Sequence, residues 1–299
     1  MGPALGAWVY SALVASAALP PLQQPPTIRA DVNLVQLHAK VTDDRGRIVP
    51  DLPKSAFELY VDGARQEITV FQGEDAPVTA GMVIDNSASM APKREDVIAA
   101  ATAFARASNP LDEMFVVHFS DHARMGLPEG RSFTSNVDEL KAAISRFELG
   151  GTTAFYDALM VAISHFGLAT YNRRIVLAIT DGGDNSSGNQ PKDVKEAAWK
   201  TGAVIFAIGI FDPADKDQNP DALTDLAAAT GGQAFFPRSS SEIPKICKQI
   251  ASDVRHEYTL GFPGAVDGRF HSIRLTARDP RYGQLHVQTR TGYIAVRPS

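Results

Sequence analysis

The sequence predicts an α/β protein: a doubly wound, mostly parallel sheet with helices on both faces, joined to a small antiparallel β-sandwich. In the middle of the chain, short aliphatic runs alternate with segments of helical periodicity. Such runs are typical of strands buried on both faces, and their alternation with helices favours a parallel sheet. At both ends of the chain, apolar and polar residues alternate with a period of two, which is typical of half-buried antiparallel strands.

The α/β domain is expected at residues 77–254. Its aliphatic runs predict strands at 81–84, 114–117, 175–179 and 203–208. Its helical periodicity predicts helices at 93–107, 137–147, 154–166, 194–200, 223–229 and 243–254. Because crossovers between parallel strands are right-handed, the strand-to-helix loops should gather at the carboxyl edge of the sheet, where such folds carry their sites.

The two flanks, residues 31–75 and 255–299, supply the sandwich strands. Period-two alternation occurs around Val35–Val41 and Phe57–Val61 in the first flank and around Tyr258–Phe262 in the second. Neither flank has enough strands to be stable alone. We therefore expect the flanks to meet as one sandwich that the α/β domain interrupts.

The amino terminus predicts export to the periplasm or the extracellular space. Residues 4–19 are apolar apart from two serines, too short a run to span a bilayer, and small residues follow an Ala15-Ser16-Ala17 end. We interpret residues 1–18 as a secretory signal peptide and 19–30 as a Pro-rich spacer. The segment has no Lys or Arg before Arg29, so an uncleaved membrane anchor or a different start site are the alternatives.

Composition excludes several classes of function. The formal charge of the 299-residue chain is −5 and no block of Lys or Arg occurs, so no nucleic-acid partner is expected. The single cysteine, Cys247, excludes an internal disulfide and a zinc site built from several thiolates. We expect Cys247 to be a small buried hydrophobe in a helix.

Oxygen-bearing residues follow the predicted parallel strands. Asp85-Asn86-Ser87-Ala88-Ser89 comes after the first strand, and Thr180-Asp181-Gly182-Gly183-Asp184 after a later one. Between them, Gly150-Gly151-Thr152-Thr153 precedes a helix. Each motif alone is explained by helix capping or a turn, but three in this order predict a cation site. Oxygen ligands without Cys or His favour Mg²⁺, with Ca²⁺ or Mn²⁺ as alternatives, over zinc or copper.

At these residues the chain resembles the von Willebrand factor A domain family. Asp85-x-Ser87-x-Ser89, the Thr152 of Gly-Gly-Thr and the Asp181 of Ile-Thr-Asp-Gly match the three parts of the metal-ion-dependent adhesion site (MIDAS) of that family. The whole layout, with its β flanks, is similar to secreted bacterial "VWFA-related" proteins. Ala88 departs from the family pattern, where glycine is usual, and would be strained only at a positive φ.

The resemblance implies the role of each metal residue. Ser87 and Ser89 would bind the cation directly, Thr152 directly or through water, and Asp85 and Asp181 mostly through water. Because neutral hydroxyls would lie closest to the ion, its open position would favour an anionic oxygen. In the family this is an Asp or Glu carboxylate of a partner protein. The expected function is therefore an exported, cation-dependent protein-binding module without catalytic residues, without a small-molecule substrate, and with a membrane contact only if the N-terminal segment is uncleaved.

Two other functions remain open from the sequence. One is a structural subunit of an envelope assembly. The other is a phosphatase-like enzyme with Asp85 as nucleophile, which is disfavoured because such enzymes need a second carboxylate at the position of Ser87. His118 and His165 are expected to be structural, whereas Asp157 is expected to cap a helix or brace the metal loops. The acidic loop of Asp212, Asp215 and Asp217 lacks the pattern of an EF-hand and is expected to be a surface loop.

Overall fold

The computed structural model describes residues 33–73, 76–147, 149–181, 183–211 and 218–297. The expected signal peptide (1–18), the spacer (19–30), Gly182 and the acidic loop 212–217 lie outside the described residues. Within the described part, no helix is both long enough and apolar enough to span a membrane.

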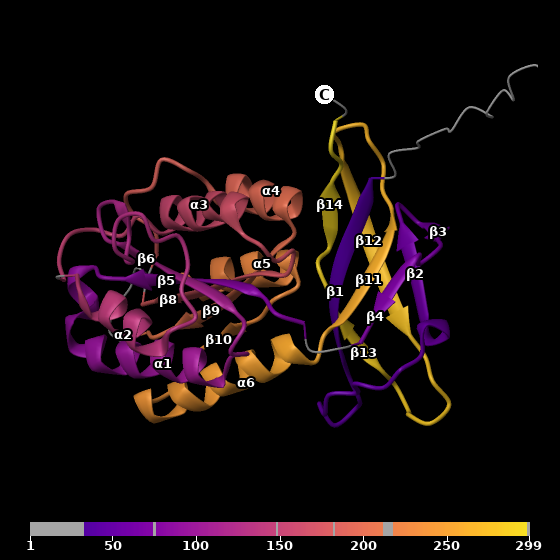
Figure 1. Cartoon of the computed structure of the whole chain (residues 1–299), viewed down its shortest axis with the longest axis horizontal. Helices are drawn as coiled ribbons and strands as arrows, with labels where there is room; N and C mark the ends of the chain where they lie inside the picture. The colour runs from indigo at the N-terminus through magenta and orange to yellow at the C-terminus, as the bar shows by residue number, and fades with distance from the viewer. Residues whose placement is uncertain (1–32, 74–75, 148, 182, 212–217, 298–299) are drawn as a thin grey trace, which may run out of the picture. The chain divides into compact units, whose positions relative to one another are not determined.

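A six-stranded sheet forms the centre of the α/β domain (Figure 1). Its strands lie in the order β10-β9-β8-β5-β6-β7, and all neighbours are parallel except β7, which pairs antiparallel with β6. This confirms the predicted mostly parallel sheet. The strands are β5 (Thr79–Asp85), β6 (Glu113–Phe119), β7 (Ala123–Met125), β8 (Arg174–Thr180), β9 (Ala203–Gly209) and β10 (Ala234–Phe235).

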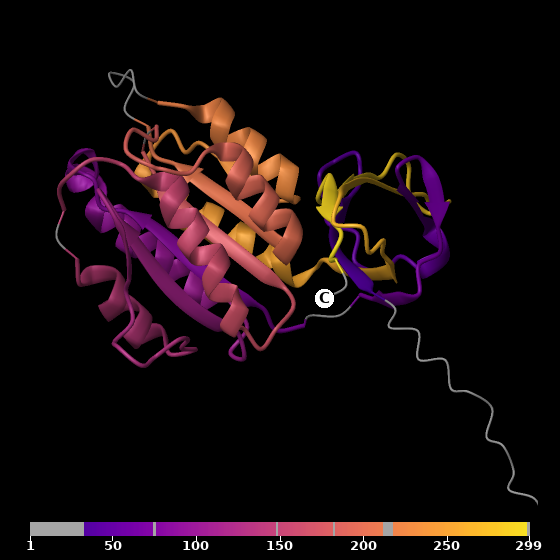
Figure 2. The same cartoon turned by 90° about the horizontal axis from the view of Figure 1, so that it is seen from above.

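Helices cover both faces of this sheet, as Figures 1 and 2 show. One face carries α1 (Arg94–Ala107), α2 (Val137–Ser145) and α6 (Ile243–Arg255). The other face carries α3 (Phe155–His165), α4 (Pro191–Thr201) and α5 (Pro220–Thr230). Short 3₁₀ helices occur at Lys54–Ala56, Ala88–Lys93, Phe166–Leu168 and Ser240–Glu242.

The two flanks combine into two four-stranded antiparallel sheets, as predicted. The sheets have the orders β13-β1-β11-β4 and β14-β12-β2-β3, so each contains strands from both flanks. Strand β1 pairs with β11, and β2 pairs with β12. The strands are β1 (Leu34–Thr42), β2 (Phe57–Val61), β3 (Ala64–Gln66), β4 (Val70–Gln72), β11 (Tyr258–Pro263), β12 (Phe270–Ala277), β13 (His286–Gln288) and β14 (Gly292–Ile294).

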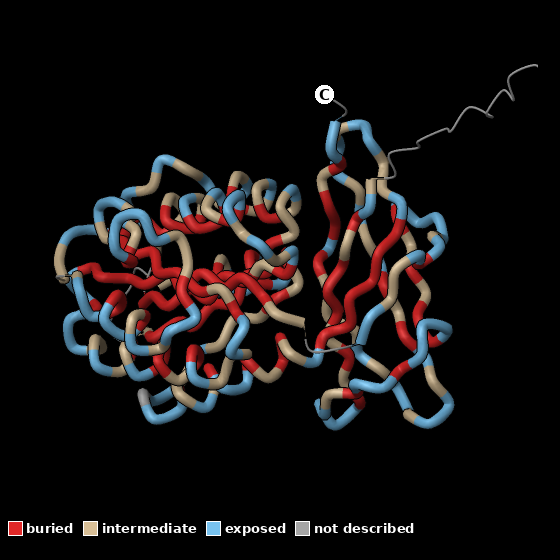
Figure 3. Tube along the Cα trace, in the orientation of Figure 1, coloured by how far each residue is buried: buried red, intermediate tan, exposed pale blue. Residues whose placement is uncertain are grey.

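Each of these regions encloses its own hydrophobic core. All seven residues of β5 are buried, which agrees with a strand covered on both faces, and the buried strands are visible in Figure 3. Cys247 lies in the α/β core, where burial raises the pKa of its thiol to about 12. A thiol held in its protonated form is unreactive, so the expectation of a small buried hydrophobe is confirmed.

Candidate metal centre

Two neighbouring parallel strands position the carboxylates of the candidate site. Strands β5 and β8 are paired with Ile84 opposite Ile179, so both end at the same edge of the sheet. Asp85 is the last residue of β5, and Asp181 follows directly after β8. The two carboxylates, far apart in sequence, are therefore brought together by strand order alone.

Hydrogen bonds link four of the five expected metal residues. Asp85 Oδ1 accepts from the backbone N–H of Ser87 at 2.8 Å. The hydroxyls of Ser87 and Ser89 are 3.1 Å apart, and Ser89 Oγ donates to Asp181 Oδ1 at 3.1 Å. The structure thus joins Asp85, Ser87, Ser89 and Asp181 in one continuous cluster.

Three residues of the cluster are buried and one is exposed. Asp85, Ser87 and Asp181 are buried, whereas Ser89 is exposed. Burial raises the pKa of the Asp85 carboxyl, hydrogen bonds from Thr180 and Ser87 oppose the shift, and the negative charge of Asp181 adds to it. A cation held here would stabilise two buried carboxylates and still face solvent.

The chemistry and spacing of these oxygens fit a hard cation. Mg²⁺ takes six oxygens at about 2.1 Å in an octahedron, which places neighbouring ligand oxygens roughly 3 Å apart. The 3.1 Å between the hydroxyl oxygens of Ser87 and Ser89, the two expected direct ligands, matches that spacing. No group of three or more His, Cys, Asp or Glu side chains suited to a metal is found among the described residues, so a cation at this edge would depend on the hydroxyls.

Thr152 lies on a separate loop. Its hydroxyl donates to Asp121 Oδ1 at 2.5 Å and lies 3.0 Å from Ser186 Oγ. In the described part of the chain, no recorded contact joins Thr152 directly to the other four residues. Its loop nevertheless contacts the loop that follows β5, because Gly150 N–H donates to the carbonyl of Asn86 at 2.8 Å. The role of Thr152 as a ligand stays a prediction.

Ala88 is accommodated without strain. Among the described residues that are not glycine, Asp62 alone has a positive φ. Ala88 begins the 3₁₀ helix Ala88–Lys93, and a helical backbone with negative φ is open to alanine. The departure from the family pattern at this position therefore leaves the loop intact.

His118 contacts the loop that follows β5. Burial lowers the pKa of His118 to about 4, so the ring is neutral near pH 7. Its Nδ1 lies 2.7 Å from the amide nitrogen of Asn86 and its Nε2 lies 3.0 Å from the carbonyl of Ala143. A neutral ring with Nε2–H satisfies both contacts, which connects α2 to the residue beside Asp85. His118 is thus a buried structural residue, as expected.

The loop after β8 is braced by acidic residues. Asp157 accepts from the backbone N–H groups of Gly188 and Asn189, and Asp184 accepts from the N–H of Tyr156 at the start of α3. His165 contacts the carbonyl of Ser132 at 2.9 Å. These contacts bear out a bracing role for Asp157 and a structural role for His165.

Three polar contacts of the site were not predicted from the sequence, in which Asp121 follows a strand and is explained as a turn residue beside the site. Thr180 donates to Asp85 Oδ2 at 2.6 Å, Asp121 holds Thr152, and Lys93 Nζ lies 2.8 Å from Asp181 Oδ2. Periodicity gives no signal for Lys93, because Ser89 and Lys93 lie four residues apart in a 3₁₀ helix, in which residues three apart share a face. The contact of Asp121 with Thr152 depends on the path of a loop, which periodicity does not predict either.

Comparisons with known proteins agree with the fold of the α/β domain. The model of the von Willebrand factor type A domain matches residues 81–249. No curated protein matches the chain. Solved structures share the fold at low identity: a von Willebrand factor type A protein from Catenulispora acidiphila has 16% identity, covers 81% of this chain and 74% of its own, and has a TM-score of 0.55.

Two further structures are similar. A conserved hypothetical protein, BatB, from Bacteroides thetaiotaomicron has 18% identity, a TM-score of 0.50 and coverage of 59% of this chain and 98% of its own. Proximal thread matrix protein 1 from the mussel byssus, with a zinc-occupied MIDAS motif, has 20% identity and a TM-score of 0.52. That match covers 65% of this chain and 49% of the mussel protein. At these identities the likeness shows the fold alone.

Proposed function

The chain belongs to the von Willebrand factor type A family, and from this premise we propose that it is a cation-dependent protein-binding module. The cation would be Mg²⁺, with Ca²⁺ or Mn²⁺ as alternatives. Ser87 and Ser89 would hold it directly, Thr152 directly or through water, and Asp85 and Asp181 mostly through water. The partner would present an Asp or Glu carboxylate to the open side of the ion.

One observation carries the proposal. Four oxygen-bearing side chains from two separate strand ends lie in one hydrogen-bonded cluster whose oxygen spacing suits a single hard ion. Such a cluster is more than helix capping requires, because the Ser89 hydroxyl reaches across to Asp181 on the next strand instead of to the backbone of its own helix. The mussel relative with a zinc-occupied MIDAS motif is a supporting parallel.

The first test is cation binding by calorimetry. We expect the protein to bind Mg²⁺ and Mn²⁺, and Ser89→Ala to weaken binding at least about tenfold because a direct ligand is lost. Ser108→Ala is the matched control, since Ser108 Oγ donates to the carbonyl of Phe104 at the end of α1, outside the cluster. Equal binding by Ser89→Ala and the wild type would contradict the proposed ligand set.

The second test concerns the partner. We also propose that the protein is exported, so envelope proteins of the native organism are captured with Mg²⁺ present and eluted with EDTA. A partner retained by the wild type and lost by Ser89→Ala supports the binding function. Retention that ignores both EDTA and Ser89→Ala would favour the alternative, a structural subunit of an envelope assembly.

An enzymatic role is the remaining alternative. Domains of this family are usually non-catalytic. A phosphatase that used Asp85 as nucleophile would need a second carboxylate two residues later, and position 87 is serine. Asp85 is also buried and already accepts hydrogen bonds at both of its oxygens. We therefore expect no hydrolysis of a generic phosphate ester, and turnover that Asp85→Asn abolishes would overturn this view.

A further inference from the structure

Lys93 contacts the same carboxylate that the proposed cation site uses. It is the last residue of the 3₁₀ helix Ala88–Lys93, and its Nζ lies 2.8 Å from Asp181 Oδ2. The ion pair is largely shielded from water, with side-chain exposures of 17% for Lys93 and 2% for Asp181. The other oxygen of Asp181 accepts from the Ser89 hydroxyl. One short segment, Ser89–Lys93, therefore satisfies both oxygens of Asp181.

A buried carboxylate needs a positive partner or full hydrogen bonding, because desolvation of an unpaired charge is costly. Among the described residues, Lys93 is the positively charged side chain that forms an ion pair with a carboxylate of the site, that of Asp181. A divalent ion bound to the same cluster would place two more positive charges close to this ammonium group. The ammonium group and the divalent ion would then repel each other and compete for Asp181.

We propose that Lys93 is a built-in counter-cation of this centre: it neutralises Asp181 before a divalent ion binds and lowers the affinity for that ion. The inference rests on the proposed function and adds a regulator to the same site. It differs from an ordinary ion pair because Asp181 is shared between Lys93 and the hydroxyl cluster, so any change in one affects the other.

The charge balance explains why such a residue is useful to a carboxylate-binding site. Asp85, Asp181 and Lys93 together carry a formal charge of −1 when both carboxylates are ionised, and a divalent ion changes this to +1. Without Lys93 the loaded site would be neutral. Lys93 thus weakens retention of the cation but leaves the loaded site positive, and a positive site attracts the carboxylate of a partner.

Calorimetric titration of the purified protein with Mn²⁺ tests the inference. We expect Lys93→Met to bind Mn²⁺ at least about tenfold more tightly than the wild type, since a unit charge at roughly 6 Å from a divalent ion contributes about one power of ten even in water and more where water is excluded. Lys93→Arg retains the charge and should bind like the wild type. Lys195→Met is the matched control, because Lys195 forms an ion pair with Asp225 on the opposite helical layer.

Thermal unfolding in EDTA is the second measurement. In EDTA, Lys93→Met should unfold at a lower temperature than the wild type, because Asp181 loses its counter-charge. Added Mn²⁺ should remove this difference in unfolding temperature. Lys93→Gln repeats both measurements with a side chain that can still donate a hydrogen bond. It keeps the test decisive if the methionine variant does not fold.

The outcomes separate this inference from the proposed function. Mn²⁺ binding by the wild type together with equal or weaker binding by folded Lys93→Met and Lys93→Gln overturns the counter-cation and leaves the cation site standing. Absence of Mn²⁺ binding by all folded variants and by the wild type overturns both. The inference is supported if Lys93→Met and Lys93→Gln bind Mn²⁺ more tightly than the wild type while Lys93→Arg and Lys195→Met do not.

Discussion

At the scale of single residues, Asp85 depends on a hydroxyl from the neighbouring strand. Thr180 is fully buried, and its Oγ1 donates to Asp85 Oδ2 at 2.6 Å. Thr180→Val keeps the shape of the side chain and removes the donor. Because hydrogen bonds to charged groups contribute most, we expect the free energy of unfolding in urea at pH 7 to fall by about 1.5–3 kcal/mol.

Thr201→Val provides the control for Thr180→Val. The Thr201 hydroxyl donates to the carbonyl of Ala197 within its own helix, where the carbonyl already belongs to the helix ladder. Its loss should change the free energy of unfolding by no more than about 0.5 kcal/mol. Equal effects of the two substitutions would mean that Thr180 does not hold Asp85 as described.

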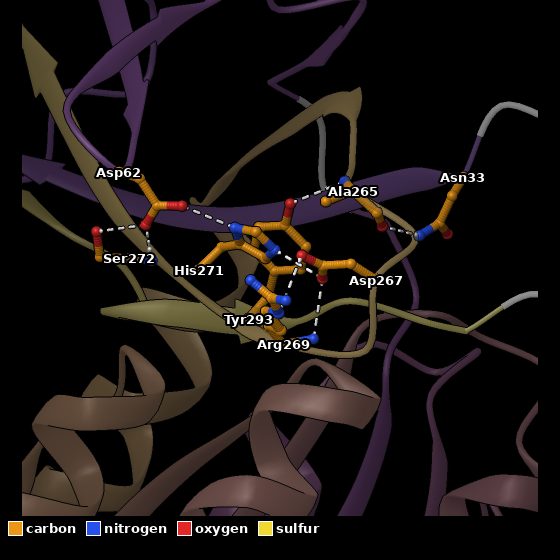
Figure 4. Close-up of polar contacts among 8 residues, drawn as sticks. All are labelled: Asn33, Asp62, Ala265, Asp267, Arg269, His271, Ser272 and Tyr293. Atoms are coloured by element: carbon orange, nitrogen blue, oxygen red, sulfur yellow. Dashed lines mark hydrogen bonds and ion pairs between the residues drawn. The ribbon is translucent and has the colours of Figure 1, made fainter.

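A histidine in the sandwich provides a pH-dependent contribution to stability. Figure 4 shows His271 between two carboxylates: Nδ1 lies 2.7 Å from Asp62 Oδ2 and Nε2 lies 3.1 Å from Asp267 Oδ1. Hydrogen bonds to Asp62 and Asp267 raise the pKa of His271 above its ordinary 6.5. The same hydrogen bond from His271 lowers the pKa of Asp62 below its ordinary 3.8. Folding therefore favours the charged form of the imidazole and of this carboxylate.

The sign of the pH dependence follows from these directions. The stabilisation from His271 is fully present below its ordinary pKa and is lost as pH rises through the raised value, whereas that from Asp62 is lost as pH falls through the lowered value. We expect His271→Gln to lower the melting temperature more at about pH 5.5 than at about pH 9. His286→Gln, at an exposed position of β13, is the control. A deficit that is independent of pH, or larger at the alkaline pH, would contradict this view.

The residues of the candidate site were predictable to different degrees. Asp85 and Asp181 follow apolar runs, and the order of parallel strands places them together, so the sequence alone predicted their proximity. The contact of Thr152 with Asp121 was not predictable, because it depends on loop closure. Gly151 has a φ of +82° there, and an added Cβ would approach Asp121 Oδ1 at 2.7 Å. Such a close approach has no periodic signature in the sequence.

At the scale of elements, long buried strands were predicted, whereas the short strands β3, β7 and β14 were missed. The four central strands of the sheet and all six helices occur near their expected positions in the described structure. Strands β3, β7 and β14 have three residues each, too few to display a period of two. Helix α4 begins at Pro191, before the predicted 194, because Gln190 and Asp193 form a capping box ahead of the first buried residue. Apolar periodicity marks the buried face of a helix and not its first turn.

The hydroxyl of Tyr258 joins strand β11 to the segment between β1 and β2. The Tyr258 hydroxyl donates to the carbonyl of Val49 at 2.7 Å and accepts from the N–H of Leu52 at 2.8 Å, all in buried surroundings. Tyr258→Phe preserves the ring, which packs against Phe57, but leaves two buried backbone groups without this partner. We expect a loss of about 2–3 kcal/mol in the free energy of unfolding.

The specificity of that loss is checked with a second tyrosine. Tyr282→Phe removes a hydroxyl that contacts the exposed carboxylate of Asp51 in the same domain. Exposed hydrogen bonds exchange with water, so this change should cost little. A Tyr258→Phe protein as stable as Tyr282→Phe would show that the segment Val49–Leu52 does not depend on the phenol.

At the scale of the whole molecule, the chain leaves the sandwich at one point and returns to it at another. Strands β1 to β4 precede the α/β domain and β11 to β14 follow it, yet each sandwich sheet contains strands from both groups. Arg173, just before β8, contacts both connecting segments: it donates to the carbonyl of Ala76 ahead of β5 and to the carbonyl of Val254 at the end of α6. It also forms an ion pair with Glu257, which leads into β11, at 3.1 Å.

This ion pair gives the last prediction, because both partners are only 4% exposed. Burial raises the pKa of Glu257, and the adjacent charge of Arg173 opposes that rise. Removing one partner leaves a buried, unpaired charge, so Arg173→Met and Glu257→Gln should each lower the free energy of unfolding by about 3–5 kcal/mol at pH 7. The double variant removes both charges together and should lose less than the sum of the two by more than about 1 kcal/mol, as measured by urea denaturation. Additive losses would mean that Arg173 stabilises the connecting segments through its carbonyl contacts alone, since these do not depend on Glu257.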